Sequence, residues 1–100
     1  MLIVLGGLIG SNDKAAIKNS YSTGSVVGAN KGGLVGISDG TVTDSYWDTV
    51  TSGLAASAGG AGAVGKSTLE MKDSATFIGW DFITIWDIDP AINDGYPFLR

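Results

Sequence analysis

The chain contains no cysteine and no histidine, and only two prolines among its 100 residues. Without the first two side chains it has no thiol nucleophile, no disulfide, none of the usual zinc ligand sets and no histidine for acid–base catalysis. Long apolar runs are missing too, because Met1–Leu5 with the glycine-rich residues that follow makes only about half a membrane span. We expect no membrane span, no metal site and no cofactor, and we read Met1–Leu5 as strand; the h-region of a signal peptide is the alternative.

Positive charge is scarce as well. Six lysines and arginines stand against ten acidic residues, which gives a net charge of −4, and the charges are scattered along the chain. No basic face is available to neutralise a phosphate backbone. Nucleic acid is therefore not an expected partner.

Glycine is abundant, with 16 residues, whereas only 16% of the chain is charged and 44% is apolar. This composition fits neither a disordered tail nor an ordinary helical domain. It indicates many short strands joined by tight turns, and the length is that of one domain.

An internal repeat is the most informative feature. Gly6–Gly10 (GGLIG) returns as Gly32–Gly36 (GGLVG) after 26 positions, and Ile17–Tyr21 (IKNSY) answers Val42–Tyr46 (VTDSY) after 25. A one-residue difference in a loop between the two halves explains the change of spacing. Periods of this size are typical of units that stack on their neighbours. The predicted pairs on adjacent parallel strands are Leu8 with Leu34, Ile17 with Val42, and Tyr21 with Tyr46.

Residue patterns within each repeat predict short strands and the corners between them. Ile17–Tyr21 alternates apolar and polar residues as a strand does, and Val26-Val27 suggests another short strand. Glycine tolerates a positive φ, so we expect glycines to form the corners between strands. The corner glycines are predicted at Gly28, Gly32, Gly36 and Gly40.

These segments resemble the GLUG motif repeats of bacterial and archaeal surface proteins. The likeness rests on GGLIG and GGLVG, followed by IKNSYSTGSVVG and VTDSYWDT. The tail (SYWDTVTSG, GKSTLEM and FIGWDF…IW…YPFL) resembles the segment that closes such arrays. The resemblance implies a non-catalytic structural or adhesive segment of a larger secreted or cell-surface protein. Its implied partners are neighbouring repeats and a glycan or protein of a host or cell surface, and its implied location is extracellular or cell-surface, although the chain shows no export signal.

The chain divides into three predicted parts: repeat coils in residues 1–53, a Gly/Ala/Ser-rich loop in 54–66, and a capping segment in 67–100. Ser67 and Glu70 form a capping-box pattern that opens a short helix through Lys72. Aromatic residues of the last part are expected to cover the open end of the last coil. They are Phe77, Trp80, Phe82, Trp86, Tyr96 and Phe98. The predicted fold is all-β, a parallel β-solenoid of about two coils with a glycine-rich loop, one short helix and an aromatic C-terminal cap.

Gly60–Ser67 satisfies the phosphate-loop pattern G-x-x-x-x-G-K-[ST]. Lys66 would contact the terminal phosphates and Ser67 a magnesium ion, with Phe82–Asp87 as the strand that carries a metal-assisting carboxylate. No buried strand precedes the pattern and the helix after it is short, so a small nucleotide binder stays an alternative and the linker is preferred.

Acidic residues suggest two further sites. Asp87, Asp89, Asn93, Asp94 and Gly95 could line a calcium loop, but their spacing fails the template and Pro90 interrupts it, so self-capped turns are preferred. Paired carboxylates for glycoside cleavage have no spacing that fixes their separation, and solvated turn residues are the default. The candidates are Asp39, Asp44, Asp48, Asp81 and Asp87.

Tyr21 and Tyr46 share one repeat position, and Trp47 adjoins Tyr46. Stacked or core aromatics are the first interpretation, since buried rings usually carry stability. A carbohydrate-binding module that uses Tyr46 and Trp47 is the alternative.

Overall fold

The computed structural model describes residues 3–100, so Met1 and Leu2 of the predicted first strand lie outside the described residues. Regular structure in the described chain is mostly short strands in five small sheets, four of which are built from parallel pairs. One short α-helix accompanies them. Of the predicted fold, a chain built mostly of strands with parallel pairing and one short helix is confirmed.

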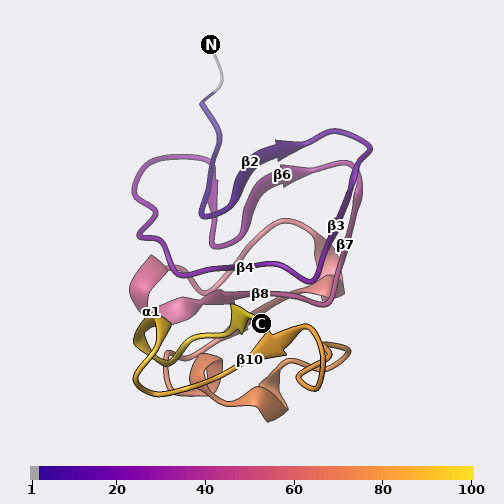
Figure 1. Ribbon diagram of the computed structural model, residues 1–100. Coiled ribbons are helices and arrows are strands. Elements are labelled where there is room, and N and C mark those ends of the chain that lie inside the picture. The colour runs from indigo at the N-terminus through magenta and orange to yellow at the C-terminus, as the bar shows by residue number, and fades with distance from the viewer. Residues whose placement is uncertain (1–2) are drawn as a thin grey trace.

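Two stretches of chain carry the same succession of four strands. The first repeat, residues 5–22, holds β1 (Leu5–Gly6), β2 (Ile9–Asn12), β3 (Ala16–Lys18) and β4 (Tyr21–Ser22). The second repeat, residues 31–48, holds β5 (Lys31–Gly32), β6 (Val35–Ser38), β7 (Thr41–Thr43) and β8 (Ser45–Asp48). Figure 1 shows β2 beside β6, β3 beside β7 and β4 beside β8.

The register between the two repeats follows the sequence period. Ile17 pairs with Val42 and Tyr21 with Tyr46 on parallel strands, and the amide of Leu8 donates to the carbonyl of Leu34 at 3.0 Å. The predicted pairs Ile17 with Val42 and Tyr21 with Tyr46 are confirmed. Leu8 lies against Leu34 as predicted, but both residues stand between strands and not within them. Each repeat thus supplies one strand to every pair, and neither repeat could pair its strands alone.

The predicted one-residue difference lies in the loop after the second strand of each repeat. Asn12 pairs with Ser38, whereas Ala16 pairs with Thr41. The first loop spans residues 13–15 and the second spans residues 39–40, so the spacing falls by one across this corner while the strands stay parallel.

Corners of the repeats differ from the prediction. Asn19 and Asp44, at matching positions, have φ of 46° and 47°, and they split the predicted strand Ile17–Tyr21 in two. Asparagine and aspartate are the non-glycine residues that enter the left-handed region most readily. Of the four predicted corner glycines only Gly28 has a positive φ, 141°. Position 32 requires glycine because a Cβ there would lie 1.8 Å from the carbonyl oxygen of Val35. Gly36 and Gly40 also leave no room for a Cβ.

The strand predicted at Val26-Val27 is absent from the structure. Val26 instead buries its side chain, and its amide donates to the carbonyl of Ser52 at 3.3 Å, whereas Val27 is exposed. A single packed valine anchors the connection between the repeats.

The predicted loop at residues 54–66 is wrong over its last part. β9 (Ala63–Lys66) pairs in parallel with β8, and the 3-10 turn η1 (Gly60–Gly62) lies under β7. Residues 56–66 thus form a third, shortened repeat, in which Ala63 pairs with Ser45 only 18 positions before it. Its glycines admit close contact: a Cβ on Gly62 would lie 1.7 Å from the carbonyl oxygen of Val42.

Ser57 replaces a backbone acceptor in this shortened repeat. In the first repeat the amides of Leu8 and Ile9 both donate to the carbonyl oxygen of Leu34, at 3.0 and 3.1 Å. The matching amides of Leu34 and Val35 donate to the side-chain oxygen of Ser57, at 3.1 and 2.9 Å. The Ser57 hydroxyl therefore takes the place that a backbone carbonyl of a further full repeat would hold as acceptor for these two amides.

Helical structure is shorter than predicted after Ser67 and occurs elsewhere as well. The capping box forms, because Ser67 and Glu70 exchange side-chain to backbone hydrogen bonds, but it opens only one 3-10 turn, η2 (Glu70–Lys72). The α-helix is α1 (Thr49–Ser52), which directly follows β8. Other short elements are η3 (Ser74–Thr76), β10 (Trp86–Asp87), η4 (Asn93–Gly95) and β11 (Phe98–Leu99).

Two apolar clusters lie on the two faces of β8, because neighbouring strand residues point in opposite directions. Trp47 faces the inner cluster, formed by Ile17, Leu34, Val35 and Val42 with Ile9, Ala58 and Ala63 packed against it. Tyr46 faces the outer cluster, formed with Met71, Phe77, Trp80 and Tyr96, against which Tyr21, Val64, Phe82, Trp86 and Ile88 pack. β8 is consequently buried along its whole length.

The C-terminal segment, residues 67–100, covers a different surface from the one predicted. Ala58 and Ala63 of the shortened repeat already close the inner cluster. The segment instead packs on the outer face of the β4-β8-β9 sheet, where Tyr21, Tyr46 and Val64 stand in one row. Most of the predicted aromatics join this cluster, and Phe98 is half-buried in β11 outside it.

Candidate functional site

The aromatic pair proposed for sugar binding is buried. Tyr46 and Trp47 are each 4% exposed and face opposite clusters. The hydroxyl of Tyr46 accepts a hydrogen bond from the amide of Ile78 at 3.1 Å, and the indole nitrogen of Trp47 donates to the carbonyl of Leu54 at 2.9 Å. The alternative of an exposed sugar platform at these two residues is wrong; their packing role is confirmed.

Gly60–Ser67 does not have the geometry of a phosphate loop. Its glycines lie in and around η1, and Ala63–Lys66 is a strand of the β4-β8-β9 sheet. A phosphate loop needs a long helix directly behind it, and η2 has three residues. Lys66 pairs with Glu70 at 4.0 Å, and Ser67 caps η2. Of the proposed strand Phe82–Asp87 only β10 forms, and it runs antiparallel to β11.

The acidic residues of the predicted calcium loop serve local structure. Asp87 accepts from the amide of Ile88 at 2.9 Å and lies 3.6 Å from Arg100, and Asp89 accepts from the amide of Ala91 at 2.8 Å. Self-capped turns are thus the observed arrangement. Among residues 3–100, no group of three or more acidic side chains is placed to hold a metal ion.

The carboxylates considered for glycoside cleavage have separate surroundings. Asp39 is exposed, and Asp44 accepts a hydrogen bond from the indole of Trp80 through its backbone carbonyl, at 2.7 Å. Asp81 accepts from the amides of Ile83 and Thr84 at 2.8 and 2.9 Å and caps that turn.

Asp48 is the most constrained polar side chain of the chain. It is fully buried at the end of β8, and its carboxylate accepts hydrogen bonds from the amides of Val50 and Thr51 (2.9 and 3.0 Å), from the Thr68 hydroxyl (2.7 Å) and from the Tyr96 hydroxyl (2.7 Å). Burial acts to raise the pKa of this carboxyl, but these hydrogen bonds outweigh it and hold the pKa below its ordinary value. Aspartate directly before a helix is a known capping signal, so the sequence carried a hint of this role.

Tyr96 is one of the hydrogen-bond donors to the Asp48 carboxylate. Burial, together with the hydrogen bond to the Asp48 carboxylate, raises the pKa of the Tyr96 hydroxyl to about 12. Above the ring of Tyr96, the ammonium of Lys72 lies 5.0 Å from the centroid. One tyrosine thereby links the end of the second repeat to the surface of the C-terminal segment.

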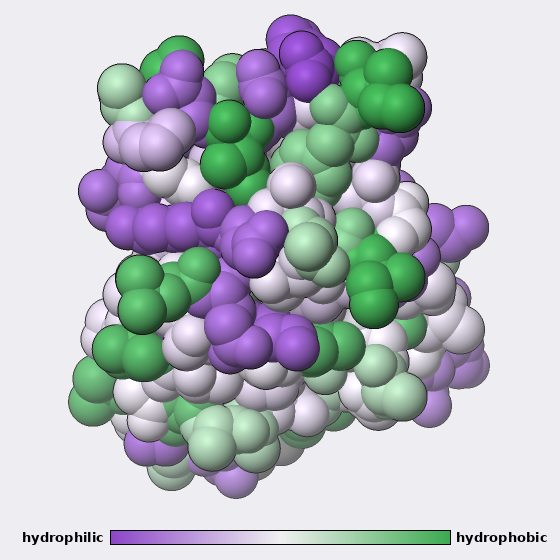
Figure 2. Space-filling model, turned by 90° about the horizontal axis from the view of Figure 1, so that it is seen from below, coloured by the Kyte–Doolittle hydropathy of each residue, from purple (hydrophilic) through white to green (hydrophobic). Residues whose placement is uncertain are grey.

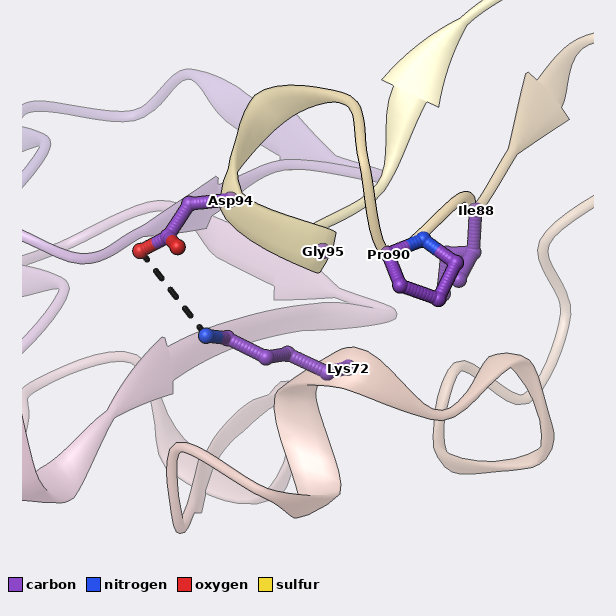
Figure 3. A pocket seen from close by; sticks show the side chains of 5 residues that line it. All are labelled: Lys72, Ile88, Pro90, Asp94 and Gly95. Atoms are coloured by element: carbon purple, nitrogen blue, oxygen red, sulfur yellow. Dashed lines mark ion pairs between the residues drawn. The ribbon is translucent and has the colours of Figure 1, made fainter.

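A small hollow lies beside the Lys72 side chain (Figure 3). Its volume is about 220 Å³, and its lining residues are Lys72, Ile88, Pro90, Asp94 and Gly95. The ammonium of Lys72 lies 3.8 Å from the carboxylate of Asp94. Since cation and anion are paired with each other, the hollow offers no net charge for recognition of a charged ligand.

The comparisons with known proteins agree with the repeat. Residues 3–27 match the family model described as the GLUG motif, so the chain contains a GLUG motif over this stretch. A protein of Evansella cellulosilytica, whose name presents it as a candidate Gly-rich membrane protein, is 40% identical over 103 residues. That alignment covers 93% of this chain and 11% of the relative. No solved structure matches the chain.

Within residues 3–100, none of the helices has the length and apolar character that a bilayer crossing requires.

Proposed function

We propose that this chain is a non-catalytic, structural or adhesive segment of a larger secreted or cell-surface protein, in which it ends a parallel β-solenoid built from GLUG repeats. The observation that carries the proposal is the stacking of two repeats in parallel at a spacing of 25 to 26 residues. A unit of this kind gains its hydrogen bonds and its apolar core from its neighbours. Neighbouring repeats are therefore the first proposed partners.

The proposed surface location is supported by the relative. The relative's name places it among Gly-rich membrane proteins, and this chain spans about a ninth of its length. The described part of this chain would then be an external portion that needs no membrane span of its own. A glycan or protein of a host or cell surface remains the proposed target of adhesion.

Brief protease treatment of intact cells tests the location. Antibodies raised against the 100-residue chain would detect the parent protein in its native cells before and after treatment. We expect the signal to disappear while a cytoplasmic marker stays intact. A signal that survives until the cells are lysed would contradict the proposed surface location.

A further inference from the structure

Among the described residues, no strand pairs with the far edges of the first repeat, whereas the second repeat is partly covered on its far side: β9 pairs with β8, and residues 56–58 exchange hydrogen bonds with residues 33–35. Within residues 3–100, the strands β1, β2, β3 and β4 each pair with a single strand, always on the side of the second repeat. We call their opposite edges, together with Leu8, the N-terminal face. Unpaired strand edges of this kind attract further strands unless they are covered.

Burial changes sharply between matching residues of the two repeats. Leu8 is 44% exposed, whereas Leu34 beneath it is fully buried. Ile9 is half-buried, whereas Val35 is fully buried. The second repeat is buried at these positions because the first repeat lies on it, and no described residue does the same for the first.

The glycine at position 10 leaves room for another strand to approach the N-terminal face closely. A Cβ on Gly36 would lie 2.7 Å from the carbonyl oxygens of both Gly10 and Leu5, so the stacked first repeat requires glycine there. Gly10 holds the matching position in the first repeat, yet a Cβ on it would meet only the carbonyl oxygen of Val4, at 3.2 Å. The first repeat thus already has the glycine that close approach of another repeat demands.

At the other end of the stack, residues 56–66 lie against the second repeat, and β9 is an edge strand within residues 3–100. Ser57 supplies the last acceptor for the amides of Leu34 and Val35, and Ala58 and Ala63 pack against the inner cluster. Figure 2 views the molecule from below, the side on which Figure 1 places the C-terminal segment, and shows apolar side chains there in separate groups among polar ones. A second copy that added its own N-terminal face to this end would therefore meet the shortened repeat, whose β9 has only four residues, and not a full repeat.

We propose that the N-terminal face docks one further repeat of the same 25- to 26-residue kind, supplied by the same polypeptide and stacked in parallel. This inference rests on the proposed function. Two copies that met face to face about a two-fold axis would set their strands antiparallel, whereas every pair between the repeats is parallel. Only a repeat that is not followed by a segment like residues 67–100 continues the parallel strand contacts seen between the two repeats.

The test uses a chain in which residues 5–30 are duplicated by insertion of a second copy after Val4. Because the natural sequence lacks cysteine, Leu8→Cys gives a unique thiol reporter, placed in the original chain or in the inner copy of the duplicated one. We expect the inner thiol to react with a maleimide at least about tenfold more slowly than the thiol of the original chain. The duplicated chain should also melt higher, by about 5 °C or more, and sediment as a monomer.

Two controls make the outcome specific. Val27→Cys, at a side chain that is 82% exposed, should react equally fast in the original chain and in the inner copy. An insert of the same composition in scrambled order should leave the inner Leu8→Cys thiol fast. Equal reaction of that thiol in the original and duplicated chains, or no rise in melting temperature, would overturn the inference. In the 100-residue chain, the Leu8→Cys thiol could instead react more slowly as the protein concentration rises. That result would show that a second copy occupies the N-terminal face, and it would also overturn the inference. Neither result bears on the cell-surface location, which protease treatment tests independently.

Discussion

The hydroxyl of Tyr96 donates a hydrogen bond of 2.7 Å to the carboxylate of Asp48, across 48 positions of sequence. Asp48 ends the second repeat and caps α1, and Tyr96 belongs to the outer cluster. The same carboxylate accepts from Thr68 at the start of the C-terminal segment. One buried side chain therefore joins the repeats, the helix and the C-terminal segment.

Asp48→Ala should lower the free energy of unfolding by about 3 kcal/mol or more, because it leaves the hydroxyls of Thr68 and Tyr96 and two helix amides without their acceptor. Urea unfolding followed by tryptophan fluorescence measures the change. Asp39→Ala, at an exposed aspartate, is the matched control and should cost less than about 0.5 kcal/mol. Equal effects of the two substitutions would contradict the role of Asp48.

Stability should fall in alkaline solution. The pKa of Tyr96 rises from 10.0 to about 12 on folding, so its contribution is complete below pH 10 and is lost as the pH rises through about 12. Tyr96 alone accounts for about 2–3 kcal/mol of this loss, and burial raises the pKa of Tyr21 and Tyr46 in the same direction. Tyr96→Phe should be less stable at pH 7 yet lose less stability between pH 9 and 11. Parallel pH profiles for the two proteins, measured by urea unfolding, would exclude this account.

Gly33→Ala should destabilise the chain by about 2 kcal/mol or more, because the new Cβ would lie 2.1 Å from the indole of Trp47, which is held in the inner cluster. Gly24→Ala is its control, since the nearest atom to that Cβ would be 3.7 Å away. Thermal melts of both variants check the contrast. A neutral Gly33→Ala would mean that Trp47 moves freely.

Ser57→Ala should cost about 2 kcal/mol, because the amides of Leu34 and Val35 lose their acceptor beside buried side chains. Faster hydrogen exchange at those two amides gives a direct readout. Ser25→Ala, at an exposed serine, should change neither quantity. Unchanged exchange in Ser57→Ala would show that water replaces the hydroxyl without loss.

Lys66→Ala should leave stability within about 0.5 kcal/mol, because the ammonium is partly exposed and its pairing with Glu70 is long, 4.0 Å. Calorimetry with ATP and magnesium should give no binding heat for either protein. Micromolar binding that the substitution abolishes would restore the nucleotide-binding alternative.

The register of the repeats could be predicted because the two copies repeat both their apolar residues and their glycines. A shift of 25 or 26 positions therefore fixes which residues face each other, as the pairs Ile17 with Val42 and Tyr21 with Tyr46 show. The shortened repeat could not be found in this way. Ala63–Lys66 is a strand because β8 offers it an edge and because Gly62 and Gly65 allow close contact, and neither cause produces a sequence period.

The C-terminal segment shows a second limit. Its concentration of aromatic residues predicted burial, which holds for Phe77, Trp80 and Tyr96. The surface that buries them depends on Ala58 and Ala63, which already close the inner cluster, and on the row of Tyr21, Tyr46 and Val64. Composition cannot show which of two apolar surfaces is already covered.

The hydroxyl of Tyr21 donates to the carbonyl of Pro97 at 2.6 Å, and Asn93 donates to the same hydroxyl at 2.9 Å. The first of these bonds spans 76 positions of sequence, so Tyr21 finds this partner only after Pro97 has been synthesised. Contacts of such long range slow folding. During synthesis the repeats leave the ribosome before the C-terminal segment does, so the row of Tyr21 and Tyr46 is at first uncovered. The time between their appearance and the arrival of the C-terminal segment is then the period in which the nascent chain is most prone to aggregate.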